Sequence, residues 1–357
     1  MANSVPVRTL KDDAGSGNYG LALKVFSGTV LEAFRAKTKF WDNTGNIMAV
    51  KQLDGGRTAQ WPIIGDDIDL ASTDSNGVDK GYHTPGHELL GQDIKMSEET
   101  ITVDDVLVAQ VDVPFADLDL NHFDVIQPYA VKLGRSLAID LDKKCATIAL
   151  KAARAAAVSN IHSGGNEVVT DTLTTAATYA AWYTNDSPGS TKFRNDASSL
   201  ARLMDEDNVP EEGRYLFIPP YMRQILRHET DVFNRDYNPE TTAGNLNERL
   251  IGVMEGFNLI LTNHIPQASV TGYTGDLVKY NGVFAGATEA GYLPAAIALC
   301  GAQEGAAGIG MVQASGLRTV IQDDERRNTK FMKAQLMVGI DMLCPWSAGA
   351  IGIWTDN

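Results

Sequence analysis

The longest regular pattern of apolar positions in the chain predicts one long helix. Apolar residues recur every three or four positions after Asp124, which is a good N-cap residue. This stripe consists of Tyr129, Leu133, Leu137, Leu141, Cys145, Ile148 and Ala152. The opposite side carries Lys132, Arg135, Lys143 and Lys144. We predict a helix over 125–156. Its apolar stripe runs through at least 28 residues, about 40 Å at 1.5 Å per residue, which is long enough to cross a whole subunit.

A second pattern, the alternation of apolar and polar residues, predicts strands on both sides of a long polar segment. The first run is 57–64, and the second extends from Thr100 to Val113 with a shift of phase along it. Residues 65–95 between them are rich in Gly, Asp, Ser and His. An isolated pair of strands is marginally stable in water, so we expect this ribbon to lie on another surface. In a homo-oligomer that surface is a neighbouring subunit.

The remaining pattern alternates helices and strands behind a polar N-terminal arm. Residues 1–20 are polar and glycine-rich, a short amphipathic helix follows, and 157–195 is typical of a loop or weak hairpin. Further predicted elements are helices over 197–207 and 220–228, and strands over 214–218, 317–322 and 329–340. The strand and helices near residue 214 indicate a compact α/β region. A charged turn, 323–327, joins the last two strands.

Charge and cysteine content narrow the class of protein. The net charge of -15, with no block of Lys and Arg, argues against a nucleic-acid reader. If the protein surrounds DNA, we expect it to do so as a container and not as a clamp. The three cysteines, Cys145, Cys300 and Cys344, are far apart, which favours reduced, buried thiols. No run of eighteen apolar residues is present, and we expect no membrane segment and no signal peptide.

The sequence contains no set of residues with the spacing of a known catalytic site. There is no P-loop, dinucleotide fingerprint, nucleophile elbow or HExxH motif. His83 and His87 have the spacing of zinc ligands, but the proline and glycine between them forbid the required helix, so a loop tip or subunit contact is preferred. Asp104 and Asp105 are adjacent, point to opposite faces of a strand, and are expected to be solvated. We predict no catalytic, cofactor or metal site and no enzymatic activity.

Several segments resemble the major capsid proteins of tailed phages, in particular the short-tailed, autographivirus-like podoviruses. They occur in the order found in that family and span about residues 21 to 349. The segments are Leu23–Gly28, Val30–Phe34, Gly56–Gly65, Asn121–Val125, Leu133–Ala138, Met254–Leu259, His264–Pro266 and Glu325–Arg327. The resemblance implies an α+β protein with the Hong Kong 97 type capsid fold.

That fold implies a division of the chain into an arm, an extended loop and two domains. The predicted boundaries are 1–50 for the N-terminal arm, 51–100 for the extended loop, 101–205 with 311–357 for the peripheral domain, and 206–310 for the axial domain. The helix over 125–156 is then the spine helix of the peripheral domain. We place candidate subunit contacts at Trp61, His83, His87, Arg326 and Arg327.

The resemblance also implies a function. The chain is expected to form hexamers and pentamers of an icosahedral head around the double-stranded DNA genome, without sequence-specific contacts to DNA. Expected partners are a scaffolding protein, a portal protein at one vertex and a decoration protein. Assembly is expected in the host bacterial cytoplasm, with the product in the virion. The alternatives are an encapsulin-type nanocompartment shell of the same fold and an ordinary soluble α/β enzyme.

Overall fold

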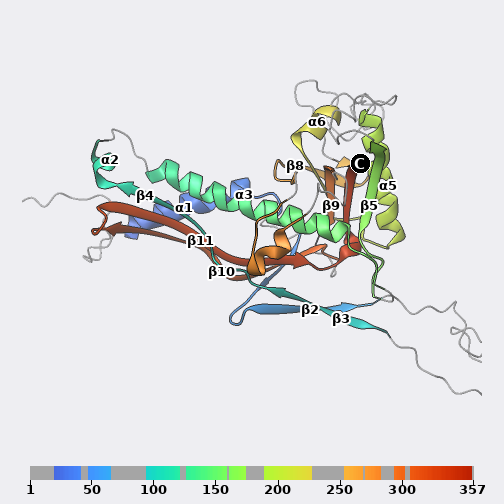
Figure 1. The fold of residues 1–357 in the computed structure, drawn as a ribbon, viewed down its shortest axis with the longest axis horizontal. Helices are drawn as coiled ribbons and strands as arrows, with labels where there is room; N and C mark the ends of the chain where they lie inside the picture. Colours follow the sequence, from blue (N-terminus) through green and yellow to red (C-terminus); the bar gives the residue numbers. More distant parts are fainter. Residues whose placement is uncertain are drawn as a thin grey trace, which may run out of the picture.

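One long helix organises the molecule. The computed structural model describes residues 20–41, 47–65, 94–120, 126–158, 161–173, 189–226, 253–267, 270–282, 293–301 and 306–355. In this part of the chain, one β-sheet runs beneath most of helix α3 (Ile126–Ala153), and a second sheet stands at its C-terminal end (Figure 1). A two-stranded ribbon lies below both.

The first sheet has four strands in the order β1-β10-β11-β4. Its bounds are β1 (Ala49–Gln52), β10 (Ile309–Asp324), β11 (Thr329–Met342) and β4 (Leu107–Pro114), and α2 (Phe115–Leu120) follows β4. β10 and β11 form a long antiparallel hairpin, to which β4 adds antiparallel and β1 parallel. Helices α1 (Gly20–Lys37) and α3 cover one face, where Met332, Ala334 and Leu336 of β11 are buried. The predicted hairpin is therefore present and extends beyond both predicted strands.

Helix α3 confirms the predicted helix, and more of its residues are buried than those of the predicted apolar stripe. The predicted N-cap, Asp124, lies outside the described residues. The apolar stripe, including Leu137 and Leu141, is buried against the first sheet and α1. A side chain at Gly134 would meet the carbonyl oxygen of Val30 at 2.5 Å, so glycine permits the close approach of α1. Lys144, predicted on the exposed side, is only 8% exposed, because the rings of Tyr273 and Tyr280 lie against its side chain.

The second sheet has six strands in the order β5-β12-β9-β6-β8-β7. Its strands are β5 (Asn166–Leu173), β6 (Arg214–Ile218), β7 (Val253–Met254), β8 (Phe257–Leu261), β9 (Leu293–Cys300) and β12 (Ala348–Thr355). The accompanying helices are α5 (Gly189–Glu206), α6 (Pro220–Leu226), η2 (Gly275–Tyr280) and η4 (Pro345–Ser347). The core between this sheet and α5 and α6 contains Phe193, Leu200 and Phe257. Strand β6 lies where the sequence predicted it, and α5 begins earlier than predicted.

Sheet membership differs from the predicted domain boundaries. Strand β5 and helix α5 fall in the segment 101–205, and β12 falls in 311–357, yet all three belong to the second sheet. β12 pairs with β5 in parallel and with β9 antiparallel after the chain turns at η4. The pairing of β12 with β5 joins residues 183 positions apart in the sequence, Gly349 and Asn166, so no local periodicity reveals it. The predicted loop 157–195 likewise contains β5 and the start of α5.

The ribbon consists of the antiparallel strands β2 (Thr58–Ile64) and β3 (Met96–Thr102). The phase shift predicted within 100–113 is the break between β3 and β4. One face of the ribbon root packs within the same subunit, because Ala59 and Ile101 are buried with Val312 and Leu343. The prediction that the ribbon lies on a neighbouring subunit was therefore wrong for its root.

Candidate assembly surfaces

The first question about the described part of the chain is whether its residues could bind a metal ion or supply a reactive thiol. No group of three or more His, Cys, Asp or Glu residues in it is placed to hold a metal ion. The thiols of Cys145, Cys300 and Cys344 are buried and are not joined in disulfides, and burial raises the pKa of the Cys344 thiol to about 12. A thiol with such a pKa is a poor nucleophile at neutral pH. No described helix is long and apolar enough to cross a membrane.

A buried carboxylate on the spine helix fastens two other segments to it. Asp142 accepts a hydrogen bond from the backbone N–H of Lys39 at 2.8 Å and lies 2.8 Å from Nδ1 of His264. Its side chain is fully buried. The segment after α1 and the segment after β8 are thus held to the middle of α3 by one side chain. The sequence offered no signal for this pair beyond the prediction that His264 is structural.

A second buried carboxylate, Asp104, joins the ribbon root to the segment around η2. The Nζ atom of Lys279 lies 2.8 Å from one carboxylate oxygen, and the Tyr280 hydroxyl donates to the other. Burial raises the pKa of Tyr280 far above its usual range, and the negative charge of the adjacent Asp104 raises it further. The Tyr280 hydroxyl therefore remains a donor. The expectation that Asp104 is solvated was wrong: it is 5% exposed, and only Asp105 faces solvent.

The ribbon has a buried root and an exposed outer end. Trp61 packs its partly buried ring against the core beneath the root, and the Nζ atom of Lys51 lies 5.2 Å from the ring centroid. At the outer end, Ile64 and Met96 are paired across the two strands and are 64% and 71% exposed. Trp61 is therefore a contact within its own subunit, while the outer end leaves apolar side chains uncovered.

The tip of the β10–β11 hairpin carries the predicted arginines on its surface. Both Arg326 and Arg327 are exposed. The Arg327 guanidinium lies 3.9 Å from Asp112 of β4 and 3.8 Å from Asp324. The backbone N–H of Arg326 donates to the carboxylate of Asp324. At these distances the ion pairs are weak, so the tip has charged groups free to meet another molecule.

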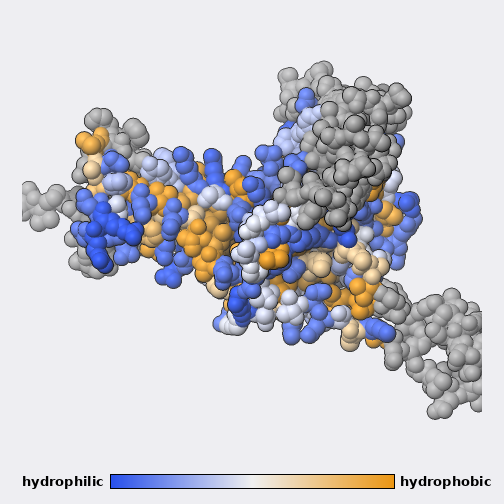
Figure 2. Space-filling view, in the orientation of Figure 1, coloured by the Kyte–Doolittle hydropathy of each residue, from blue (hydrophilic) through white to orange (hydrophobic). Residues whose placement is uncertain are grey.

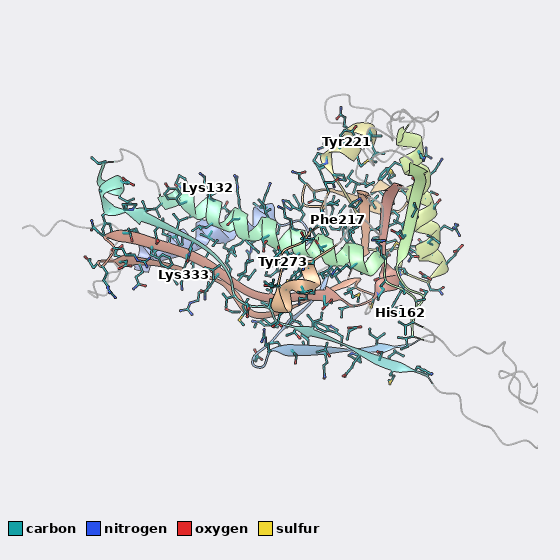
Figure 3. The ribbon with its side chains drawn as sticks, in the orientation of Figure 1. Lys132, His162, Phe217, Tyr221, Tyr273 and Lys333 are labelled. Atoms are coloured by element: carbon teal, nitrogen blue, oxygen red, sulfur yellow. The ribbon has the colours of Figure 1, made fainter. Side chains whose placement is uncertain are left out.

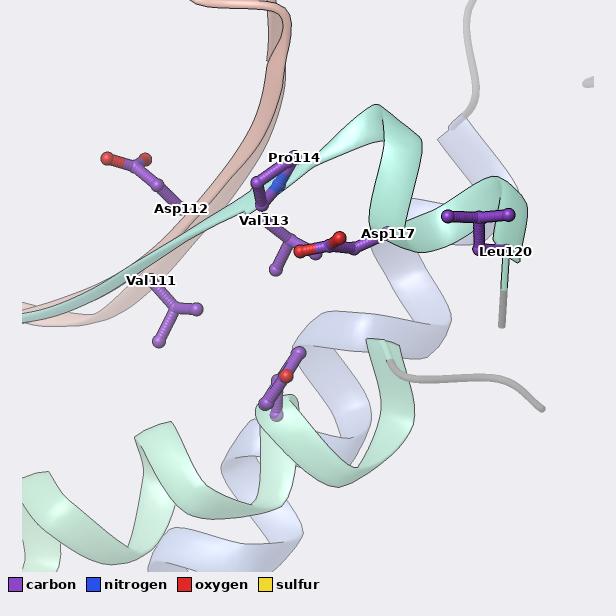
Figure 4. Close-up of a pocket in the computed structure, with 7 residues that line it drawn as sticks. Val111, Asp112, Val113, Pro114, Asp117 and Leu120 are labelled. Carbon is purple, nitrogen blue, oxygen red and sulfur yellow. The ribbon is translucent and has the colours of Figure 1, made fainter. Parts of the chain in front are cut away.

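A hollow of about 310 Å³ lies beside this tip, between β4, α2 and the first turns of α3 (Figure 4). It is lined by Val111, Asp112, Val113, Pro114, Asp117, Leu120 and Tyr129. Leu120 is 78% exposed. Hydrophobic surface also shows along the face of the molecule between α3 and the first sheet (Figure 2). The exposed apolar side chain beside the charged tip makes this region a candidate contact surface.

Of the five predicted contact residues, the structure describes Trp61, Arg326 and Arg327. His83 and His87 lie outside the described residues. The three that are described do not come together: Trp61 lies in the ribbon root, and the arginines lie at the far tip of the first sheet. The exposed Ile64, Met96 and Leu120 were missed by the sequence analysis, because single apolar residues in strands and short helices are normally buried.

Comparisons with known proteins give these surfaces a context. Residues 74–351 match the model of the family described as Gp10A-like major capsid protein. The major capsid protein of Escherichia phage T7 is 34% identical over 131 residues, which are 36% of this chain and 34% of that relative. The match therefore spans about a third of the T7 protein.

Solved structures agree with the fold. The capsid structure of cyanophage P-SCSP1u has a TM-score of 0.70 and 29% identity, and the similarity covers 100% of both chains. The mature capsid of bacteriophage PhiM1 has a TM-score of 0.66 and 16% identity, with 88% of this chain and 87% of that chain covered. The predicted Hong Kong 97 type capsid fold and the resemblance to podovirus capsid proteins are thereby confirmed. This chain belongs to the Gp10A-like family of phage major capsid proteins.

Proposed function

We propose that the chain assembles with copies of itself, as hexamers and pentamers, into an icosahedral head that encloses double-stranded DNA. The observation that carries this proposal is the family match over most of the chain. The physical support is the position of its uncovered groups. Apolar side chains lie at the outer end of the ribbon, and charged side chains lie at the opposite tip of the first sheet. Small contacts at such separated points add up over a closed symmetric shell.

In this proposal the two sheets take the parts of the two capsid domains. The first sheet with α1 and α3 is the peripheral domain, and the second sheet with α5 and α6 is the axial domain. The ribbon is the extended loop, whose outer end covers its apolar pair, Ile64 and Met96, on an adjacent subunit. Arg326 and Arg327 meet carboxylates of adjacent subunits at the tips. His83 and His87 stay proposed contacts of the loop.

The remaining partners follow from the same proposal. A scaffolding protein directs assembly in the host bacterial cytoplasm, a portal protein occupies one vertex, and a decoration protein binds the outside. The chain has no enzymatic activity and contacts DNA without sequence preference, because the net charge of -15 keeps the genome from adhering tightly to the wall.

An encapsulin-type shell, which encloses enzymes instead of DNA, is the alternative. The family match to phage major capsid proteins does not favour it. The contents of purified particles decide between the two: nuclease-protected DNA in particles from phage-producing cells supports the phage head, and a protein cargo without DNA supports the nanocompartment.

The test of assembly is the size of the purified protein. We expect sedimentation and electron microscopy to show closed particles of megadalton mass. The double variant Ile64→Ser with Met96→Ser is expected to keep the thermal stability of the protomer, since both side chains are exposed, and to lose closed particles. A parent protein that remains a small soluble species under all assembly conditions would refute the proposal.

A further inference from the structure

The tertiary structure gathers on one surface positive charges that are dispersed in the sequence. Arg35 and Lys37 end α1, and Lys39 follows in the next turn. Lys132, Arg135 and Lys143 lie about a hundred residues further along the chain, on the outward side of α3. All six side chains are exposed. Figure 3 shows Lys132 on the side of α3 that faces away from the first sheet.

These cations lack carboxylate partners, in contrast to most others in the described residues. Elsewhere Arg57 pairs with Asp276, Arg202 with Glu206 and Arg194 with Glu255. None of the six residues on α1, α3 and the turn between them forms an ion pair within the described part of the chain. The surface is positive although the whole chain has a net charge of -15.

The few carboxylates on these helices do not neutralise the surface. Asp142 is buried with His264, and Asp140 pairs with Lys144 at 3.0 Å. Glu32 is the one exposed carboxylate on the described faces of α1 and α3. The helix dipole accounts for cations in the last turn of α1 but not for those in the first half of α3.

A groove of about 300 Å³ runs between the two helices at this surface. Its lining residues are Thr29, Glu32, Ala33, Ala36, Lys37, Gln127, Val131 and Arg135. The apolar part of its lining, here called the floor, consists of three small side chains, Ala33, Ala36 and Val131. One cation from each helix, Lys37 of α1 and Arg135 of α3, and one carboxylate, Glu32, also line it. An apolar floor with a net positive lining is complementary to a helix that has an apolar stripe and acidic flanks.

We propose that this α1–α3 groove is a docking site for an acidic amphipathic helix of an assembly partner. A DNA duplex is the less suitable occupant, because phosphates use the cations and leave the apolar floor without a role. This proposal rests on the proposed function in one respect, namely that the docked helix belongs to a partner in assembly. Binding is measured on the purified full-length chain, so it succeeds or fails independently of particle formation.

The probe is a fluorescent amphipathic peptide of about 18 residues, with Leu at positions i, i+3, i+4 and i+7 and Glu elsewhere. A scrambled peptide of the same composition and a DNA duplex of about 20 base pairs are the comparison ligands. We expect saturable binding of the amphipathic peptide that weakens as salt is raised, and much weaker binding of both comparison ligands.

Two variants, a matched control and one replacement variant test the geometry. Arg135→Glu is expected to weaken binding of the amphipathic peptide by at least about tenfold, which is 1.4 kcal/mol. The matched control, Lys333→Glu, makes the same charge change on the opposite face of the first sheet and is expected to leave binding unchanged (Figure 3). Ala36→Lys adds a cation but fills the floor of the groove, so it should weaken binding of the peptide. Lys37→Glu replaces Arg135→Glu if circular dichroism shows that the latter is unfolded.

Three outcomes overturn the proposal. In the first, neither the amphipathic peptide nor the duplex binds. In the second, the scrambled peptide or the duplex binds as tightly as the amphipathic peptide, which makes the surface a general polyanion site. In the third, Ala36→Lys strengthens binding of the amphipathic peptide, because charge alone then accounts for the interaction.

Discussion

The spine helix and the ribbon are both long, yet they are stabilised in different ways. Helix α3 is buried along its apolar stripe, and its C-terminal half is enclosed by both sheets. The ribbon is covered on one face at its root, while Ile64 and Met96 at its outer end remain in solvent. The helix completes its core within the subunit, and the ribbon leaves part of its apolar surface for another molecule.

This difference separates residues that determine folding from residues that determine assembly. A substitution in the spine helix changes the free energy of unfolding of the protomer. In the proposed assembly, a substitution at the outer end of the ribbon or at the sheet tip is expected to change the contact with another copy and to leave the stability of the protomer nearly unchanged. The ribbon root lies between these cases, because Asp104 and Trp61 tie it to its own subunit.

The largest expected effect is that of Leu137→Asp. Leu137 is buried in the main core, so the variant places an unpaired carboxylate there, which costs several kcal/mol out of the roughly 5–15 kcal/mol of a typical protein. We expect insoluble protein after expression, measured as the soluble fraction of the lysate. Ser136→Asp, at the exposed neighbouring position, is the control and stays soluble. Recovery of soluble, helical Leu137→Asp would show that the stripe is not core.

The next effect is that of Asp142→Ala. This variant removes the acceptor for the backbone N–H of Lys39 and the partner of His264, and breaking a buried pair costs about 3–5 kcal/mol. Urea denaturation of the unassembled protein measures the loss. A double-mutant cycle with His264→Ala is expected to give a coupling of about 0.5–3 kcal/mol. Additive losses would mean that the two side chains stabilise α3 independently.

Trp61→Ala tests whether the ribbon root belongs to its own subunit. The ring is partly buried on that core, so we expect a loss of about 2 kcal/mol in the stability of the unassembled protomer, below the 3–5 kcal/mol typical of a fully buried aromatic. Ile64→Ala at the outer end serves as control, with a change within about 0.5 kcal/mol. If Trp61→Ala affects assembly and leaves protomer stability unchanged, the root is held by a neighbour.

A smaller, pH-dependent effect is expected for Asp341→Asn, where the ribbon root meets α3. Burial raises the pKa of Asp341. Burial also raises the pKa of Glu99 on β3, and the negative charge of Asp341 adds to that shift. A raised folded pKa means that the carboxyl group stabilises the fold below its unfolded pKa, and this contribution is lost as pH rises through the folded value. The variant should therefore melt higher than the parent near pH 7. A difference in melting temperature that does not shrink toward pH 4 would contradict this.

The smallest effect on the protomer is expected for Arg326→Glu with Arg327→Glu. Exposed ion pairs contribute about 0–1 kcal/mol each, so thermal stability should hardly change. Assembly should fail at low salt and recover as salt screens the repulsion between tips. Light scattering across a salt series follows both. If the double variant assembles as well as the parent in low salt, the turn is ordinary solvated surface.

The sequence by itself determined the local elements and the absence of known catalytic motifs. The stripe on α3, the two runs of the ribbon and the final hairpin were predictable, because burial on one side of a helix or strand imposes its own periodicity. The order of short family-like segments was enough to predict the Hong Kong 97 type fold. The exposed tip arginines were predictable as surface, since a run of charges in a turn has no core to enter.

Only the tertiary structure decided which segments pair and which polar groups are buried. The transfer of β5 and β12 to the second sheet depends on hydrogen bonds between segments that are far apart in the sequence. Asp104, Asp142 and Lys144 have the sequence context of solvated residues, and enclosure by distant segments buries them. The same long-range contacts bring α1 beside α3 and join six dispersed cations into one surface. Local periodicity reports whether a residue faces a core, whereas long-range packing decides which segments make up that core.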